Sequence, residues 1–353
     1  MATIKDVASK AGVSTATVSR ALAGGSNVTP ELRQRIQAAV GELGYRPNRL
    51  ARNLRRQNTE TIGVVVSDIE NPHFTQVVRA VEDAAYHRGF RVLLCNTDES
   101  PEKQQSYLNV LAAERVVGVI LSPSDPSGPE ISDLLDVGIP VVAFDRRVDD
   151  PRADAVVIDN ARGARLATEY LINLGHDRIG FVAGLPKIQT GRERLAGHEE
   201  AMRIRGLPVS AESGEFRIDQ AYRATKTLLA DETLSALLVA NNLMTIGALR
   251  AVRLCEKRVP EDVAIVSFDD PPWAELVEPP LTTLAQPIRD MAECAVKLLF
   301  ERISGARTKP KTEVFAFSLT IRQSCGGAAK AGDGAPKPGD GVAVDGRDES
   351  SGG

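Results

Sequence analysis

The stretch Thr3-Ile-Lys-Asp-Val-Ala-Ser-Lys-Ala-Gly-Val-Ser-Thr-Ala-Thr-Val-Ser-Arg-Ala-Leu22 decides how the chain begins to fold. Thr3 can cap a first helix, and Gly12 can adopt the positive φ that ends it. Ser14 can then cap a second helix. The apolar positions at helical spacing are Ile4, Val7, Ala8 and Ala11 in the first helix and Val18, Ala21 and Leu22 in the second. Two short helices joined by a tight glycine turn predict a helix-turn-helix.

A third helix is expected directly after this pair. Thr29-Pro30 supplies a cap followed by proline at the first helical position, and Gly44 closes an apolar stripe that runs from Leu32 to Leu43. The next segment, Arg46 to Arg56, holds five arginines in eleven residues. It is either a solvated charged linker or a short hinge helix, capped by Asn48, that forms only on DNA or a second copy of the chain.

Charge is distributed unevenly along the 353 residues. Residues 1–60 carry ten Lys or Arg and four Asp or Glu, whereas the chain as a whole has a net charge of −4. Because Lys and Arg that neutralise phosphates drive nucleic-acid affinity, the basic first segment is the part expected to meet DNA. A chain of this length is expected to form two or three domains.

The first 56 residues resemble the DNA-binding head of the LacI/GalR family of bacterial transcriptional regulators. The matches are Ile4-Lys-Asp-Val-Ala, Ala11-Gly-Val-Ser, Thr17-Val-Ser-Arg20 and the hinge pattern from Pro47-Asn48 to Leu54. The resemblance implies that the second helix enters the major groove of a palindromic operator and that paired hinge helices of a homodimer insert Leu54 at the minor groove. The DNA-contacting residues it implies are Thr3, Ser14, Thr15, Ala16, Thr17, Arg20, Asn27, Tyr45, Asn48, Arg49, Ala51 and Leu54. Arginine can form two hydrogen bonds with the edge of a guanine, and Thr and Ala methyl groups can pack against a thymine methyl.

From Thr61 onward, apolar β-branched runs alternate with helical patterns in two consecutive halves, which indicates parallel sheets built from βαβ units. The fold class expected is an all-α head followed by an α/β two-lobed domain, similar to the periplasmic sugar-binding proteins that the family uses as effector domains. The predicted parts are residues 1–46 (head), 47–60 (hinge), 61–325 (effector domain) and 326–353 (disordered tail). The resemblance implies a first lobe of about 61–158 and 287–312 and a second of 159–286 and 313–325. A single last strand is expected over Glu313 to Thr320.

Polar residues that directly follow apolar runs are the candidate ligand contacts, because ligands of such sheets bind beyond the carboxyl ends of the strands. The candidates are Asp68, Asp145, Arg146, Asn241, Asp269 and Gln286, joined by Arg194 and by Phe74 as an apolar face. Trp273 either lines the cleft mouth or packs between the lobes. Each strand-end residue could instead be an ordinary cap or turn former.

A neutral polyol suits this set of planar charged groups and an aromatic ring. The Asp145-Arg146 pair and Gln286 resemble those of ribose-type binding proteins, which implies a pentose or similar monosaccharide as effector. A nucleoside or another non-sugar metabolite is the alternative. Asn242 and His73 depart from the family pattern, which usually has an aspartate and an aromatic residue at these places.

Other functional classes find less support in the sequence. The chain has no nucleophile elbow, phosphate-binding glycine loop or metal-ligand spacing, so neither an enzyme nor a cofactor is expected. The four cysteines Cys95, Cys255, Cys294 and Cys325 are scattered and read as incidental thiols. A transport binding protein would share the fold, but the chain opens on a basic head and not on a leader. No apolar run could span a membrane, so a cytoplasmic repressor is predicted, with either sign of effector coupling.

Overall fold

The computed structural model describes residues 2–22, 28–44 and 59–327, and the chain divides into two compact units, Met1–Thr59 and Glu60–Gly353. Each unit is built around its own hydrophobic core. The predicted tail disorder concerns residues that, apart from Gly326 and Gly327, lie outside the described part.

The first unit contains the three helices α1 (Ile4–Lys10), α2 (Thr15–Leu22) and α3 (Pro30–Glu42). Thr3 and Asp6 form a reciprocal capping box at the start of α1, with the Thr3 amide donating to Asp6 Oδ2 over 2.7 Å. The Ser14 hydroxyl accepts from the Thr17 amide (3.1 Å), and Gly12 between the helices has φ +61°. The sequence-based expectation of a cap, a glycine turn and a second cap is therefore confirmed.

The head encloses a small core to which all three helices contribute. Its fully buried side chains are Val7, Val18 and Ile36, one from each helix. Leu22, expected to point inward, is only partly buried and packs against the edge of this core. Three helices joined in this way bury one side of α2 and leave the other side open to solvent.

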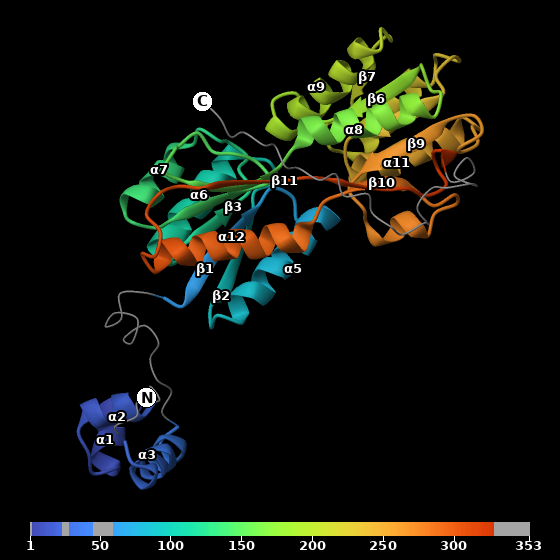
Figure 1. Cartoon of the computed structure of the whole chain (residues 1–353). Helices are drawn as coiled ribbons and strands as arrows, with labels where there is room; N and C mark the ends of the chain where they lie inside the picture. Colours follow the sequence, from blue (N-terminus) through green and yellow to red (C-terminus); the bar gives the residue numbers. More distant parts are fainter. Residues whose placement is uncertain (1, 23–27, 45–58, 328–353) are drawn as a thin grey trace, which may run out of the picture. The chain divides into compact units, whose positions relative to one another are not determined.

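The described part of the second unit contains two six-stranded sheets (Figure 1). The first sheet has the order β11-β5-β4-β3-β1-β2, with all neighbours parallel. Its strands are β1 (Thr61–Val66), β2 (Arg91–Asn96), β3 (Val119–Leu121), β4 (Val141–Phe144), β5 (Asp154–Ile158) and β11 (Thr312–Phe315). Its helices are α5 (Pro72–Tyr86), α6 (Pro101–Ala113), α7 (Pro129–Asp136) and α12 (Ile288–Ile303). Val64 and Val66 face the core shared with α5 and α12, whereas Val65 faces α6 and α7.

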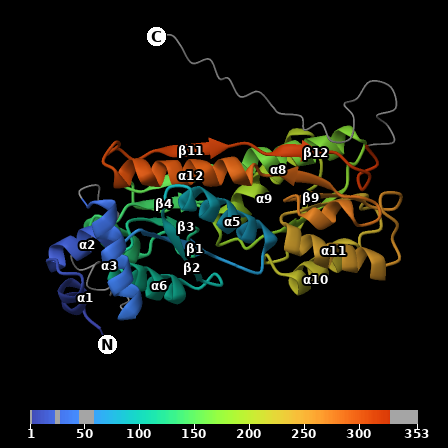
Figure 2. The ribbon, with the colours of Figure 1, turned by 90° about the horizontal axis from the view of Figure 1, so that it is seen from below.

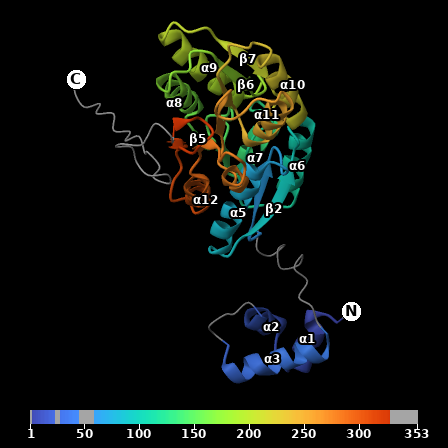
Figure 3. The same ribbon diagram turned by 90° about the vertical axis from the view of Figure 1, so that its right-hand side faces the viewer.

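The second sheet has the order β12-β10-β9-β8-β6-β7, and β12 is the one strand that runs antiparallel to its neighbour. Its strands are β6 (Ile179–Ala183), β7 (Ser210–Ser213), β8 (Ala236–Val239), β9 (Ala264–Phe268), β10 (Thr282–Ala285) and β12 (Ser318–Thr320). The helices are α8 (Asn160–Asn173), α9 (Gln189–Ile204), α10 (Ile218–Leu228) and α11 (Asn242–Leu254), with the 3₁₀ turn η1 (Pro272–Glu275). Figure 3 shows the pairs α8 with α9 and α10 with α11 covering this sheet.

The chain passes between the two sheets three times. The passages follow β5, β10 and β11, and α12 packs on α5 in the first lobe, as expected for the final helix. The expected single strand over Glu313 to Thr320 was wrong: β11 belongs to the first sheet and β12 to the second. The third passage therefore lies at Ala316 and Phe317 and not near residue 312, and β11 and β12 follow one another along the molecule (Figure 2). Phe317 packs edge-on against Phe268 with ring centroids 5.2 Å apart, which anchors this passage in the core.

Within the described residues, no helix is both long and apolar enough to cross a membrane.

Candidate functional site

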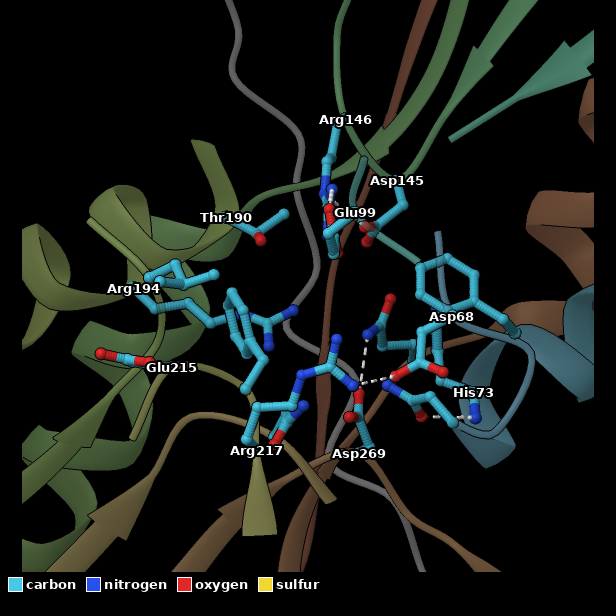
Figure 4. Close-up of a pocket in the computed structure, with 16 residues that line it drawn as sticks. Asp68, His73, Glu99, Asp145, Arg146, Thr190, Arg194, Glu215, Arg217 and Asp269 are labelled. Carbon is cyan, nitrogen blue, oxygen red and sulfur yellow. Dashed lines mark hydrogen bonds and ion pairs between the residues drawn. The ribbon is translucent and has the colours of Figure 1, made fainter. Parts of the chain in front are cut away.

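A pocket lies between the two lobes, at the carboxyl ends of the strands (Figure 4). About 620 Å³ of space not filled by protein atoms lies in this region, open solvent at its mouth included. The first lobe lines it with Asp68, Asn71, His73, Phe74, Glu99, Asp145 and Arg146. The second lobe and the passage after β10 line it with Leu185, Thr190, Arg194, Glu215, Phe216, Arg217, Asn241, Asp269 and Gln286. The sequence-predicted strand-end residues are thus brought together from both lobes.

Asp145 and Asp269 occupy equivalent places in the two lobes. Each directly follows an inner strand, β4 or β9, and each has a positive φ, 68° for Asp145 and 67° for Asp269. Backbone strain of this kind costs about 1 to 3 kcal/mol and persists where the surrounding structure imposes it, often at ligand sites. The strained turns hold both carboxylates in the pocket, where they are buried.

A hydrogen-bond network holds the carboxylate of Asp269. Its Oδ1 accepts from Gln286 Nε2 over 2.8 Å, and its Oδ2 accepts from the Asn242 amide over 3.2 Å. Asn241 beside it caps α11, because its Oδ1 accepts from the Met244 amide (2.8 Å). Asn241 therefore has the capping role that was the alternative to ligand contact, and it lines the pocket as well.

Arg194 extends from α9 into the pocket and is 4% exposed. Its Nε donates to Asn160 Oδ1 (2.8 Å) and its Nη1 to the Ala240 carbonyl (2.5 Å). The guanidinium carbon lies 4.4 Å from the ring centroid of Phe268, a cation–π contact that fixes its plane. Burial lowers the pKa of Arg194 from its ordinary value, although the carboxylate of Asp269 counteracts this effect.

Arg146 in the first lobe has a different environment. Its Nη1 and Nη2 each donate to one carboxylate oxygen of Glu99 over 2.6 Å, and Nη1 also donates to the Pro123 carbonyl over 3.0 Å. Burial disfavours the charged form, but the hydrogen bonds and negative charge of Glu99 outweigh it and raise the pKa of Arg146. Arg146 is therefore a firmly charged group with its own buried partner.

Three polar contacts join the lobes across or beside the pocket. Arg217 Nη1 lies 3.6 Å from Asp68 Oδ2, and the two side chains approach from opposite walls in Figure 4. Asn242 Nδ2 donates to Asn71 Oδ1 (3.0 Å), and the Arg147 amide donates to Gln189 Oε1 (3.0 Å). These contacts close the cleft around the pocket.

Several residues that line the pocket were not recognised from the sequence. Trp273, expected either at the cleft mouth or packed between the lobes, does not line this pocket and packs against the hydrophobic core. Phe216 and Arg217 follow β7, whose short polar sequence gives no strand signal, so their strand-end position could not be recognised. Glu99 could have been suspected, because it lies just beyond the apolar run that forms β2.

On the head, the outward side of α2 carries Thr15, Ala16 and Arg20, all exposed. Thr3, Ser14 and Thr17 are instead engaged in caps: the Ser14 and Thr17 hydroxyls lie 2.9 Å apart at the start of α2. The remaining predicted DNA contacts lie outside the described residues; they are Asn27, Tyr45, Asn48, Arg49, Ala51 and Leu54.

Comparisons with known proteins agree with this architecture. Residues 3–48 match the model of the lacI family of bacterial regulatory proteins, and residues 168–325 match a periplasmic binding protein-like domain. The ribose operon repressor of Halalkalibacterium halodurans is 36% identical over 93% of this chain and 98% of its own length. The chain belongs to the LacI family of bacterial regulatory proteins.

Other members of the family illustrate its range. The HTH-type transcriptional repressor PurR of Photobacterium profundum is 34% identical over 92% of this chain and 98% of its own. A lac repressor dimer bound to operator and an anti-inducer superposes with a TM-score of 0.81 at 29% identity, covering 92% of this chain and 99% of that one. A LacI family regulator of Enterococcus faecium with bound ribose gives a TM-score of 0.69 at 30% identity, covering 75% and 98%. The ribose operon repressor, PurR and the lac repressor are transcriptional repressors and not enzymes, and the Enterococcus faecium protein is a transcriptional regulator.

No cluster of three or more His, Cys, Asp or Glu side chains that could hold a metal ion occurs among the described residues.

Proposed function

We propose that this LacI-family chain is a homodimeric repressor that binds a palindromic operator in the cytoplasm and responds to a neutral monosaccharide, in the first instance a pentose such as ribose. The observation that carries this proposal is the pocket itself, in which buried polar groups from both lobes converge on one small space. The proposed parts of the chain are the head (1–46), hinge (47–60), effector domain (61–325) and tail (326–353). The last passage between the lobes lies at Ala316 and Phe317.

The pocket offers a sugar hydrogen-bond partners on several sides. Asp145 and Asp269 can accept from hydroxyl groups, while Arg194 can donate, since the hydrogen bonds of its Nε and Nη1 to other described residues leave Nη2 for the ligand. Phe74 and Phe216 supply aromatic surface from opposite lobes. Planar charged groups combined with aromatic faces are the chemistry that binds polyols. The relative with bound ribose supports this choice.

The head offers a DNA-reading surface. Thr15, Ala16 and Arg20 are presented to base edges, with Thr3, Ser14 and Thr17 near phosphates and with Asn27, Tyr45, Asn48, Arg49, Ala51 and Leu54 completing the proposed contacts. Closure of the lobes on the effector would alter the dimer contacts and so the operator affinity, a coupling of about 1 to 3 kcal/mol in ordinary allostery.

Two exposed apolar regions suit a dimer interface. Leu93 and Leu94 are exposed on the edge strand β2, which is unpaired on its outer side within the described sheet. Leu276, at the end of η1 in the second lobe, is 83% exposed. Because unpaired edge strands invite pairing and contiguous exposed apolar surface often marks an interface, a second copy that contacts both lobes would cover them. The lac repressor dimer, a structural neighbour of this chain, supports the dimeric state that we propose.

Arg20→Ala tests the reading of DNA by α2. The substitution is expected to cost about 1 to 3 kcal/mol of operator binding and to relax the sequence preference, because a bidentate contact to a base edge is lost. Fluorescence anisotropy against the operator and against scrambled DNA measures both effects. Arg35→Ala is the control, because Arg35 is an exposed residue of α3 with the same charge. This variant should keep the sequence preference; an equal loss of preference in both variants would contradict the assignment.

A further inference from the structure

The ion pair between Arg146 and Glu99 is the most completely formed charge contact in the pocket. Both guanidinium Nη atoms meet the two carboxylate oxygens at 2.6 Å, and the side chains are only 7% (Arg146) and 15% (Glu99) exposed (Figure 4). The remaining Nε lies 3.6 Å from Asp145 Oδ2. This fork-to-fork geometry is the one by which arginine recognises a carboxylate or phosphate.

The backbone takes an unfavourable conformation to place Glu99 there. Asp98 and Glu99, in the turn between β2 and α6, have φ of 52° and 59°, and the Glu99 amide donates to the Ser67 carbonyl (3.1 Å). For a residue with a Cβ, the left-handed region of φ and ψ costs conformational free energy, whereas glycine or asparagine is more easily accommodated there. A turn that needed only this conformation would not require a glutamate, so the carboxylate itself has a role.

The charged residues that line the pocket indicate how the Glu99 carboxylate affects the choice of ligand. Among the described lining residues there are five carboxylates (Asp68, Glu99, Asp145, Glu215 and Asp269) and three guanidinium groups (Arg146, Arg194 and Arg217). Each cation already has at least one acceptor: Arg146 has Glu99, Arg194 has Asn160 and the Ala240 carbonyl for its Nε and Nη1, and Arg217 has Asp68. An anionic ligand would therefore enter a pocket with excess negative charge, and the bidentate face of Arg146 is already occupied.

We propose that Glu99 determines the effector class: its carboxylate fills the anion-binding face of Arg146, so that the pocket accepts an uncharged sugar and rejects a phosphorylated or carboxylated one. This inference deepens the proposed function and rests on it for the location of the effector. Arg146 then acts on the ligand as part of a neutral pair with Glu99, and Asp145 beside it is left to accept a ligand hydroxyl.

Glu99→Gln in the full-length protein tests the proposal. Gln keeps the shape of the side chain but removes its charge, so the uncompensated Arg146 should bind anions. Isothermal titration with inorganic phosphate and with D-ribose 5-phosphate is expected to show at least a tenfold gain in affinity over the unmodified protein. Asp98→Asn is the matched control. Asp98 carries the same charge as Glu99 and precedes it in the chain, but its side chain pairs with Lys103 outside the pocket. This variant should bring no gain.

A second variant covers the case in which Glu99→Gln folds poorly. Glu99→Ala leaves space beside Arg146 for a small carboxylate, so acetate should raise the Tm of this variant and not that of Asp98→Ala. An equal response to acetate in both, or a Glu99→Gln variant that binds phosphate no better than Asp98→Asn, would overturn the proposal. So would an unmodified protein that binds D-ribose 5-phosphate as tightly as D-ribose.

The outcomes also separate this inference from the proposed function. In one outcome, Glu99→Gln gains affinity for phosphate but the unmodified protein binds no neutral sugar. This outcome supports the role of Glu99 at the anion-binding face of Arg146. It overturns both the acceptance of a neutral sugar and the pentose assignment. Binding of a neutral sugar without the phosphate gain leaves the pentose assignment intact and overturns the role of Glu99.

Discussion

Asp269→Asn is expected to lower effector affinity at least 100-fold while the repressor still binds its operator. Asp269 is buried at the end of β9, where its oxygens accept from Gln286 Nε2 and from the Asn242 amide. Removing the charge weakens these bonds and the charge-assisted bonds to ligand hydroxyls, each worth about 1.5 to 3 kcal/mol. A hundredfold loss corresponds to about 2.8 kcal/mol.

The assay begins with a thermal-shift screen of the unmodified protein against monosaccharides, nucleosides and sugar phosphates. A ligand at 100 times its Kd stabilises the native state by about 2.7 kcal/mol, which such a screen detects. Titration calorimetry with the ligand found then compares the variants. Asp270→Asn is the control, because Asp270 pairs with Arg322 (2.7 Å) and does not line the pocket. It should reduce stability and leave the affinity unchanged; an Asp269→Asn affinity within fivefold of the unmodified protein would place the effector elsewhere.

Asp154→Ala should destabilise the effector domain by about 3 to 5 kcal/mol, the usual effect of removing one partner of a buried ion pair. Asp154 begins β5 and is fully buried. Its oxygens accept from Arg307 Nη1 (2.7 Å) and Nη2 (3.0 Å) and from the Lys311 amide (2.6 Å). The substitution removes the carboxylate that Arg307 and Arg302 share and leaves Glu301 as the remaining carboxylate partner of Arg307 (2.9 Å). It also frees the segment that leads into β11, so it loosens two of the three passages between the lobes where they leave the first sheet.

Urea unfolding measures this loss as the change in midpoint multiplied by the slope m. Asp136→Ala is the matched control, since Asp136 pairs with Arg152 at the surface, where both side chains are about half exposed or more. Surface pairs of this kind contribute about 0 to 1 kcal/mol. If Asp154→Ala cost no more than Asp136→Ala, the buried network would have no role in holding the first lobe.

Much of the architecture could be predicted because its signals are local. Thr3, Gly12 and Ser14 mark helix starts and a turn within a few residues of one another, and each behaves in the structure as its chemistry suggests. The alternation of apolar strands with helices likewise predicts parallel sheets. Parallel topology in turn brings strand ends together, which is how Asp145 and Asp269 could be assigned to one site from opposite lobes.

The parts that could not be predicted depend on contacts between distant segments. Glu99 pairs with a residue 47 positions away, and no local pattern encodes that meeting. The run Glu313 to Thr320 reads as one strand, because nothing in its composition shows that Ala316 and Phe317 leave one sheet for another. The sequence left the place of Trp273 open, because a single aromatic residue after a strand can pack inward as readily as it can line a cleft.

Operator affinity with and without effector tests the central claim most directly. The full-length protein would select its palindromic operator from a random DNA library, and anisotropy titrations at moderate salt would then be run with and without the sugar identified by thermal shift. We expect sequence-specific binding that changes about 5- to 150-fold on addition of the sugar, and no change in the Asp269→Asn variant. Binding no tighter to the operator than to scrambled DNA, or an operator affinity indifferent to a sugar that binds the pocket, would contradict it.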